Sequence, residues 1–583
     1  MRLGIDFGST YSTLAHFNRA LNNVETITMA EGTPASIPSV VSIARKSKTV
    51  TCGDAAKAQI GKKTVRIFEA FKMLLTESNP DILRQRGYDE TYTPREITRL
   101  YLESVLKTAL LREGETEVEE LVICVPEIWG KRVTTLDGRM ILRDLLRREI
   151  SVPVEHVQVV TEPEAASAYF AYNYERETGK RFNGHLLLID YGGGTLDITL
   201  TEVFSDGHGS MEIGYREGGG AGENHPGEHG ESVIGSAGIA YMQSVLVLAL
   251  REGGLLPDGE APDYTAPDFV AAVRDLESQL KSAERMKEIE DFFGTYGSYR
   301  KMKRVLKEER VEFCSVEYSG EEVPVYYHQL FAAYQQTIAG VLAEQVREIN
   351  EKVRRHIDAD PCEPDAGAKD DFKIALVGGF GSFYLVKQQI AEIYHLDTNS
   401  KTDPRTKNIT ANKREQAISL GAALLAEGKI VLQKTARYSI GLCTKNAKGR
   451  VTGLYYGIRY HQNIEPGKPY YLLSRPDAGD KPENRVTWAA LYGNIESFVI
   501  EFTDRLDHGG LMDVKPEILE RLRQLPDFGF WNCGFSMDEN DVVSFHVTPR
   551  PIPGLPDQRE GIVIPLDSYS RMFDLTAVRE VTV

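Results

Sequence analysis

The sequence predicts an α/β protein of two related lobes, followed by a smaller antiparallel β-domain. Two stretches, residues 2–15 and 186–199, share the order apolar strand, aspartate, glycine, hydroxyl residue and second strand. Separate copies of one pattern in a chain indicate repeated structural units. Residues 269–289 and 323–356 show helical patterning, whereas beyond residue 430 the pattern changes to short β-type runs, such as residues 485–492, interrupted by Gly, Pro, Asn and Asp. Such runs are typical of a compact antiparallel domain.

Length and composition are those of a soluble globular protein with several domains. The chain has 583 residues, of which 42% are hydrophobic and 26% are charged, and both fractions are ordinary. Its net charge of −17 argues against a nucleic-acid partner, which would require a basic surface. No apolar run approaches the roughly 18 residues of a membrane span, and the chain enters a strand directly, so we expect neither a membrane segment nor a signal peptide. The six cysteines are scattered without a C-x-x-C pair, as expected for thiols in a reducing cytoplasm.

The second of the two repeated stretches reads LLLIDYGGGTLDIT. Its apolar run into Asp190 predicts a buried strand. Gly192, Gly193 and Gly194 permit positive φ and let backbone N–H groups approach an anion closely. Asp190 and Asp197 place carboxylates beside those donors, and a cation such as Mg²⁺ could lie between such carboxylates and a phosphate. A plain β-hairpin with a glycine turn is the alternative.

The N-terminal copy reads RLGIDFGSTYSTLA. Its first strand reaches Asp6, and the turn that follows offers one glycine and several hydroxyl groups, in Gly8, Ser9, Thr10 and Tyr11. Two hairpins of this kind, far apart in the chain, are expected to belong to two lobes that face one nucleotide.

Both stretches resemble the phosphate-binding motifs of the actin, sugar-kinase and DnaK-type heat-shock ATPase superfamily. The resemblance extends over residues 1–430 and implies a two-lobed actin-like (ribonuclease H-like) ATPase domain, with lobe I at about 1–185, lobe II at about 186–375 and final helices to 430. It implies ATP or ADP with Mg²⁺, and K⁺ as an optional ion. The implied phosphate-binding residues are Gly8, Ser9, Thr10, Tyr11, Gly192, Gly193, Gly194 and Thr195, and the implied metal ligands are Asp6, Asp190 and Asp197.

Lys72 and Glu162 complete the implied catalytic set, together with Asp190 and Thr195. Lys72, in FEAFKMLL, resembles a family lysine near the γ-phosphate, where its charge would stabilise the transferring group. The alternative is an exposed lysine on an amphipathic helix, because residues 55–75 show helical patterning. Glu162, in VVTEPEAAS, resembles the family glutamate beside the attacking water. Its alternative role is that of an acidic residue favoured at a helix N-terminus.

Two further stretches resemble the nucleoside-binding parts of the family. SAERMKE resembles a helix that contacts the nucleoside, and GGFGS resembles the adenosine motif, in which glycines leave room for the ligand. The family usually carries an arginine at the places of Glu288 and Ser382, and the two arginines stack on adenine. Phosphate binding is therefore better supported than adenine specificity. The implied nucleoside-binding residues are Glu284, Lys287, Gly378, Gly379 and Ser382.

Residues 431–583 resemble the family's peptide-binding antiparallel β-sandwich in position and strand density. The stretch PDFGFWNCGFSMDENDVVSFHV is most alike. The acidic-leucine linker of the family is replaced by IVLQKTA, starting at Ile430, and no helical segment follows the β-runs before Val583, so we expect no helical lid. A domain that binds passing polypeptides and a domain that docks one dedicated partner both remain open.

These features identify the chain as a divergent member of the heat-shock protein 70 (DnaK-type) family by resemblance. The resemblance implies a cytoplasmic, Mg-dependent ATPase with weak intrinsic turnover, whose nucleotide state is coupled to polypeptide binding by the β-domain. A polypeptide substrate or dedicated partner and a co-chaperone are the implied partners, without nucleic acid or membrane. A small-molecule kinase of the same superfamily is one alternative, although the sequence indicates no acceptor pocket and no aspartate base outside the shared motifs. An actin-like assembly protein is the other, although the appended β-domain would be unusual.

Overall fold

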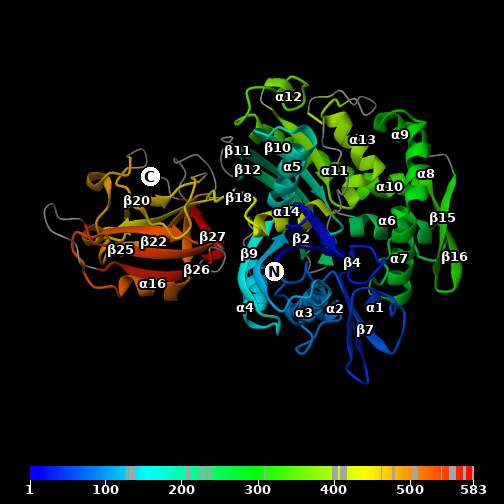
Figure 1. The fold of residues 1–583 in the computed structure, drawn as a ribbon, viewed down its shortest axis with the longest axis horizontal. Coiled ribbons are helices and arrows are strands. Elements are labelled where there is room, and N and C mark those ends of the chain that lie inside the picture. Colours follow the sequence, from blue (N-terminus) through cyan, green and yellow to red (C-terminus); the bar gives the residue numbers. More distant parts are fainter. Residues whose placement is uncertain are drawn as a thin grey trace. The chain divides into compact units, whose positions relative to one another are not determined.

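The computed structural model divides into two compact units (Figure 1). Unit 1 comprises residues 1–130, 142–213 and 217–432, and unit 2 comprises residues 131–141, 214–216 and 433–583. The structure describes residues 1–126, 129, 138–204, 211–221, 225–226, 232–233, 238–264, 266–306, 310–369, 371–396, 403, 405–406, 416–436, 438–460, 462–475, 479–501, 510–539, 541–550, 560–568 and 573–580.

The first large sheet of unit 1 contains the N-terminal hairpin. Its strand order is β3-β2-β1-β8-β9, and β4 pairs with β2. Strands β1 and β2 are antiparallel, whereas β1–β8 and β8–β9 are parallel. The bounds are β1 (Arg2–Phe7), β2 (Tyr11–Asn18), β3 (Asn23–Ile27), β4 (Ile37–Pro38), β8 (Val118–Val125) and β9 (Val154–Thr161).

The second large sheet repeats this arrangement around the second hairpin. Its order is β17-β10-β11-β12-β18, with β10 antiparallel to β11 and parallel to β17. In both sheets, the first strand of a hairpin lies beside a parallel strand from later in the chain. The mixed α/β fold is confirmed. The bounds are β10 (Gly184–Tyr191), β11 (Leu196–Phe204), β12 (Met211–Ala221), β17 (Lys373–Val377) and β18 (Ile430–Gln433).

Two helices, α5 (Glu162–Thr178) and α14 (Ala417–Ala426), pack against both sheets. They are rich in alanine, and one apolar cluster joins them to residues of β2, β8, β10 and β11. Their approach requires small residues, because a Cβ on Gly421 would overlap the backbone oxygen of Ala165. A Cβ on Gly4 would likewise overlap the backbone nitrogen of Ala423. The two hairpins are thus attached to a common pair of helices.

A smaller antiparallel sheet precedes Lys72 in the chain. It has the order β6-β5-β7, with β5 (Val40–Ala44), β6 (Val50–Cys52) and β7 (Val65–Glu69). The helical pattern predicted over residues 55–75 is wrong, because only α1 (Asp54–Lys57) forms there. Strand β7 pairs with β5 and buries Val65 and Phe68, so a partner distant in the chain determined its conformation.

Most of the remaining helices of unit 1 lie in the chain between β12 and β17, and they share one apolar core with strands β10 and β11 of the second sheet. The single helix predicted over residues 323–356 is wrong: β16 occupies its start, and Ile338, with φ −114°, separates α10 from α11. The helix predicted over 269–289 is interrupted at Ser282, which has extended backbone and caps α8. The bounds are α2 (Pro80–Gln85), α3 (Pro94–Glu113), α4 (Gly138–Arg148, which spans both units), β13 (His225–Pro226), β14 (Ser232–Val233), α6 (Gly238–Glu252), α7 (Pro267–Lys281), α8 (Ala283–Gly294), α9 (Tyr299–Val305), β15 (Glu312–Tyr318), β16 (Glu321–Tyr326), α10 (Tyr327–Thr337), α11 (Ala339–Val353), α12 (Ala366–Lys369), η2 (Phe380–Ser382) and α13 (Tyr384–Ile393).

Unit 2 contains two antiparallel sheets with orders β20-β19-β22-β23-β27 and β21-β24-β25-β26. One apolar cluster includes residues of both sheets, and the rings of Phe498 and Phe535 lie 5.6 Å apart. The strand predicted over residues 485–492 is wrong, because Trp488 begins α15 and its indole N–H donates to Pro526 O at 2.8 Å. The bounds are β19 (Ser439–Lys445), β20 (Val451–Ile458), β21 (Tyr470–Tyr471), η4 (Pro482–Asn484), α15 (Trp488–Leu491), β22 (Ile495–Glu501), β23 (Gly510–Val514), α16 (Pro516–Arg523), β24 (Asn532–Met537), β25 (Val542–Thr548), β26 (Ile562–Ser568) and β27 (Phe573–Glu580).

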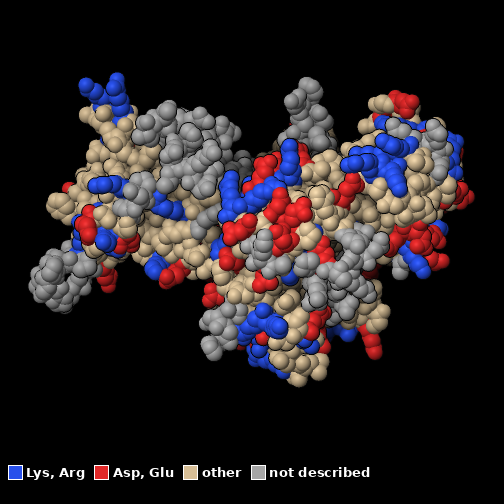
Figure 2. Space-filling model, turned by 90° about the horizontal axis from the view of Figure 1, so that it is seen from above, with Lys and Arg blue, Asp and Glu red and all other residues tan. Residues whose placement is uncertain are grey.

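Acidic and basic side chains are interspersed over the face of the protein shown in Figure 2. Within the described ranges, no helix has both the length and the apolar character needed to span a bilayer.

Candidate functional site

The turns of the two repeated hairpins lie against each other. A Cβ added to Gly193 would overlap the hydroxyl of Thr10, and one added to Gly194 would lie 2.8 Å from Ser9 Oγ. Real Cβ atoms are not found at such distances, so only glycines permit this approach. The structure therefore brings together the two stretches that the sequence predicts to bind phosphate.

The first turn connects β1 to β2 directly after Asp6. Asp6 faces Thr13 across the hairpin. A Cβ on Gly8 would overlap the backbone oxygen of Tyr11, and the hydroxyl of Ser39 donates to Gly8 O at 2.7 Å. The turn is tight, and its hydroxyl residues Ser9 and Thr10 lie next to the second hairpin.

The second turn connects β10 to β11 and is supported by helix α6. Asp190 faces Asp197 across this hairpin, and Gly192 N donates to Thr195 O at 2.9 Å. Ile239 N at the start of α6 donates to Gly193 O at 2.8 Å. The positive end of that helix dipole therefore lies beside the turn, where it favours negative charge. The sequence predicts a helix over residues 239–250, but its local pattern does not indicate that this helix supports the turn.

Two buried carboxylates lie on the strands that flank the second turn. Asp190 and Asp197 are 3% and 0% exposed. Asp190 Oδ2, Thr10 Oγ1 and Thr13 Oγ1 are buried oxygens for which no hydrogen-bond partner is found in the described chain. Buried polar atoms without a hydrogen-bond partner are expected to bind a ligand, water or an ion.

The carboxylate oxygens suit a hard cation that takes its other ligands from water and phosphate. No three Asp, Glu, His or Cys side chains of the described residues form a direct metal-binding group, and the ligand set Asp6, Asp190 and Asp197 stays a prediction. Mg²⁺ usually retains waters and uses one or two carboxylates together with phosphate oxygens. Asp190, with its buried oxygen, fits that requirement.

Burial and mutual repulsion disfavour charge on two of these carboxylates. Burial raises the pKa of Asp6 to about 7, with a further rise from the charge of Glu162 and a partial offset from Lys72. Burial also raises the pKa of Asp190 well above its usual range, and the charges of Glu162, Asp197 and Asp6 add to the effect. Such a cluster of acidic groups favours the arrival of a cation.

Lys72 and Glu162 form a buried ion pair beside these carboxylates. Lys72 is 2% exposed, which excludes the exposed helical lysine. Glu162 begins α5, at a corner fixed by a capping box between Thr161 and Glu164. Burial lowers the pKa of Lys72, but the charges of Glu162 and Asp6 outweigh burial and raise it overall. The lysine is therefore held as a cation near both turns.

The predicted nucleoside-binding residues separate into two groups. Gly378, with φ +79°, lies so close to Asp190 that a Cβ would overlap its carboxylate. Gly379 faces open space, and the hydroxyl of Ser382 donates to Gly379 O at 2.9 Å. Glu284 and Lys287 are exposed on α8.

Helices α1 and α7 contact the first hairpin and β7 in ways that no local sequence pattern indicated. Lys281 Nζ lies 4.4 Å from the ring centre of Tyr11, and Lys57 Nζ donates to the hydroxyl of Tyr11 at 2.9 Å. Arg274 forms ion pairs with Glu69 of β7 and with Glu277 of its own helix. The pair of Glu69 and Arg274 joins residues 205 positions apart, and only the fold reveals such contacts.

Comparison with known proteins agrees with this geometry. Residues 2–214 match the family model described as Hsp70 protein. The chain is 26% identical to a ribosome-associated molecular chaperone of Zygosaccharomyces rouxii over 34% of each chain. It is 28% identical to the chaperone protein DnaK of Nitrosopumilus maritimus over 36% of this chain and 30% of the relative. For the chaperone protein DnaK of Thermotoga neapolitana the identity is 30%, over 39% of this chain and 33% of the relative.

Each match spans about a third of the relative's length. The matched residues 2–214 contain both hairpins, Lys72 and Glu162. Through this N-terminal region, the chain is similar to the Hsp70 protein family.

Proposed function

We propose that unit 1 binds Mg-ATP and hydrolyses it slowly, and that the protein acts as a chaperone-like ATPase. The observation that carries the proposal is the meeting of the two turns, at Gly193 and Thr10, beside the buried carboxylate of Asp190. Backbone donors and hydroxyls would bind phosphate oxygens there. The similarity of residues 2–214 to the Hsp70 protein family favours this function over the kinase and filament alternatives.

Each group has a distinct role in the proposed reaction. The turn residues Ser9, Thr10 and Gly192–Thr195 orient the phosphates with backbone N–H and hydroxyl donors. When bound, Mg²⁺ would neutralise phosphate charge, with Asp190 as a ligand and Asp6 and Asp197 beside it. Lys72 provides a fixed positive charge near the γ-phosphate, and Glu162 holds that lysine in place and accepts a hydrogen bond from the attacking water.

The coupling to polypeptide belongs to the same proposal. The relatives are named as chaperones, and unit 2 contributes two antiparallel sheets with a shared core. We expect nucleotide to alter the accessibility of residues 430–437, which include the β18 strand and precede the sheets of unit 2 in the chain. Limited proteolysis there should differ between ATP-saturated and nucleotide-free protein. Identical cleavage would show that unit 2 does not respond to nucleotide, whether it binds a passing polypeptide or a dedicated partner.

The catalytic assignment is tested by phosphate release from Mg-ATP, with and without an unfolded peptide. Lys72→Met should lower turnover by about a hundredfold, the scale of one lost transition-state stabiliser. Lys373→Met provides the matched control, because Lys373 is also buried, at 7% exposure, but lies at the opposite end of β17 from Gly378.

Folding must be separated from catalysis in this experiment. Removing Lys72 leaves Glu162 as an uncompensated buried charge, and breaking such a pair costs about 3–5 kcal/mol. The double variant Lys72→Met/Glu162→Gln removes both charges and should recover thermal stability but not turnover. Unchanged turnover in folded Lys72→Met would contradict the role of this lysine.

A further inference from the structure

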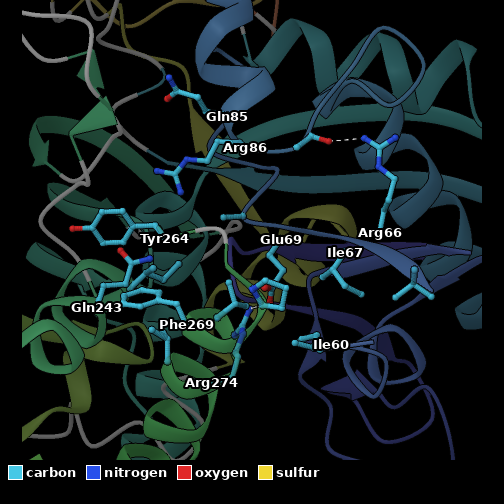
Figure 3. Close-up of a pocket in the computed structure, with 18 of the residues that line it drawn as sticks. Ile60, Arg66, Ile67, Glu69, Gln85, Arg86, Gln243, Tyr264, Phe269 and Arg274 are labelled. Atoms are coloured by element: carbon cyan, nitrogen blue, oxygen red, sulfur yellow. Dashed lines mark hydrogen bonds and ion pairs between the residues drawn. The ribbon is translucent and has the colours of Figure 1, made fainter. Parts of the chain in front are cut away.

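A cavity lies within unit 1, between the β5–β7 sheet and helices α6 and α7. Its volume is about 670 Å³, within the range of roughly 300–1,000 Å³ typical of small-molecule sites. Figure 3 shows side chains of both walls extending into it, with Glu69 and Arg274 close together. Ser9 of the first turn also lines the cavity, so the cavity borders the phosphate-binding turns.

One wall of this cavity is strongly basic in a protein whose net charge is −17. Its basic residues come from β7, from α2 and from the adjoining loops, and they are Arg45, Lys62, Lys63, Arg66, Arg84 and Arg86. Arg66 is paired with Asp89 and Arg84 with Asp81. Lys62 is exposed, as is Lys63, and neither ammonium group has an ion pair within the described ranges. Positive charge thus remains available at the rim.

Arg86 extends this positive charge into the cavity. Figure 3 shows it beside Tyr264 and Gln243 of the opposite wall. Burial lowers the pKa of Arg86 below its ordinary value, against smaller opposing contributions from Tyr88 and Tyr264. A partly desolvated guanidinium gains more from an anion than one in water does, since the interaction is less screened.

The opposite wall offers a different chemistry. Tyr264 and Gln243 present a half-buried ring and an amide, and Phe269, at 1% exposure, forms the apolar base. The acidic side chains that line the cavity, Glu69 and Glu277, are both bound by Arg274. A ligand with an anionic end toward the basic wall and a polar body toward Tyr264 matches both sides.

We propose that this cavity binds a phosphorylated small molecule with at least two negative charges, at a site separate from the paired turns. Arginine forks and lysine ammonium groups are the side chains that bind phosphate oxygens best. Lys62, Lys63 and Arg86 hold the phosphate, while Tyr264 and Gln243 contact the remainder. Because both walls contribute, the ligand stabilises the approach of β7 to α7 that Glu69 and Arg274 already make.

The test uses the full chain and calorimetric titration with fructose 1,6-bisphosphate and inorganic pyrophosphate. The unmodified protein should bind at least one of them saturably. Lys62→Gln/Lys63→Gln should weaken that binding by about tenfold or more, the effect expected for two lost charge-assisted contacts. Both lysines are exposed, so folding should be unaffected.

Two controls locate the ligand. Lys46→Gln/Lys48→Gln removes the same charge from exposed lysines of the β5–β6 connection that do not line the cavity, and should change affinity less than about twofold. Gly193→Ala alters the paired turns and should leave bisphosphate binding unchanged.

Several results would overturn the proposal. One is that neither probe binds saturably. Another is that the Lys62/Lys63 and Lys46/Lys48 double variants lose the same affinity. A third is that Gly193→Ala abolishes binding, which would place the ligand in the turns. Equally tight binding of citrate or of an acidic peptide would overturn the phosphate class.

Discussion

The two hairpins of unit 1 have the same topology but different chemistry. The first has one carboxylate, Asp6, opposite a hydroxyl residue, Thr13, and its turn carries hydroxyl side chains. The second has two carboxylates facing each other, Asp190 and Asp197, and its turn is mostly glycine backbone. In the proposed site, the first hairpin would contribute mainly side-chain hydroxyls to the bound nucleotide, and the second would contribute backbone donors and the carboxylates for the metal.

Support from the rest of the fold also differs between the two hairpins. The second turn receives a hydrogen bond from the start of α6 and lies against Gly378. The first is approached by Lys281 and Lys57 through Tyr11. We infer that the second hairpin fixes the cation, whereas the first adapts to the phosphate.

The largest expected effect comes from the second hairpin. Asp190→Asn should weaken Mg-nucleotide binding by about a hundredfold, since truncating one partner of a buried charge interaction costs about 2–5 kcal/mol. Glu217→Gln, which changes another buried acid of the same sheet at 2% exposure, is the matched control. Calorimetry with and without Mg²⁺ measures both. An unchanged affinity in Asp190→Asn would remove the metal role from this hairpin.

The contact between the turns is tested by two neighbouring glycines. An added Cβ at Gly193 would overlap Thr10, whereas one at Gly192 would meet its nearest atom at 3.7 Å. Gly193→Ala should therefore weaken nucleotide binding by about thirtyfold, for an overpacking cost of about 2 kcal/mol, and Gly192→Ala by less than about twofold. Equal behaviour of the two variants would contradict a shared site.

Local patterns predicted the hairpins well because each is formed by neighbours in the chain. An aspartate, a glycine and hydroxyls between two apolar runs suffice to specify strand, turn and strand. The start of α5 at Glu162 was likewise readable from the proline that follows it. These segments carry their own conformational signals.

Non-local contacts explain what the sequence did not predict. β7 is a strand because it pairs with β5, and α15 replaces a predicted strand because Trp488 is buried against unit 2 residues such as Phe545. The pairing of Lys72 with Glu162 and of Glu69 with Arg274 depends on segments 90 and 205 residues apart. Periodicity within a short window contains no information on such partners.

The pH dependence of binding sharpens the difference between the hairpins. With a pKa of about 7, Asp6 is mostly protonated at pH 6 and mostly ionised at pH 8, and only the ionised form favours a cation. Mg-nucleotide affinity should therefore rise by about tenfold between these pH values, the effect of one proton in competition with the cation. Asp6→Asn should flatten this dependence. A rise of the same size in Asp6→Asn would assign the proton to another group.

The smallest effect concerns the base. In the proposed site the hairpins hold the phosphates, whereas Ser382 is hydrogen-bonded within its own turn and Glu284 and Lys287 are exposed. ATP and GTP affinities should then differ by less than about tenfold, or 1.4 kcal/mol. Competition calorimetry compares them directly. A hundredfold preference for ATP would show that other side chains near Gly379 bind the adenine specifically.

The central claim is that both hairpins serve one Mg-nucleotide. Titration of the full chain with ATP in the presence and absence of Mg²⁺ tests it most directly, repeated with Gly8→Ala in the first hairpin and Asp190→Asn in the second. The account predicts one nucleotide per chain, Mg²⁺-dependent affinity, and weakening of that single site by either substitution. Saturation by two nucleotides, no binding at millimolar ATP, or sensitivity to only one hairpin would contradict it.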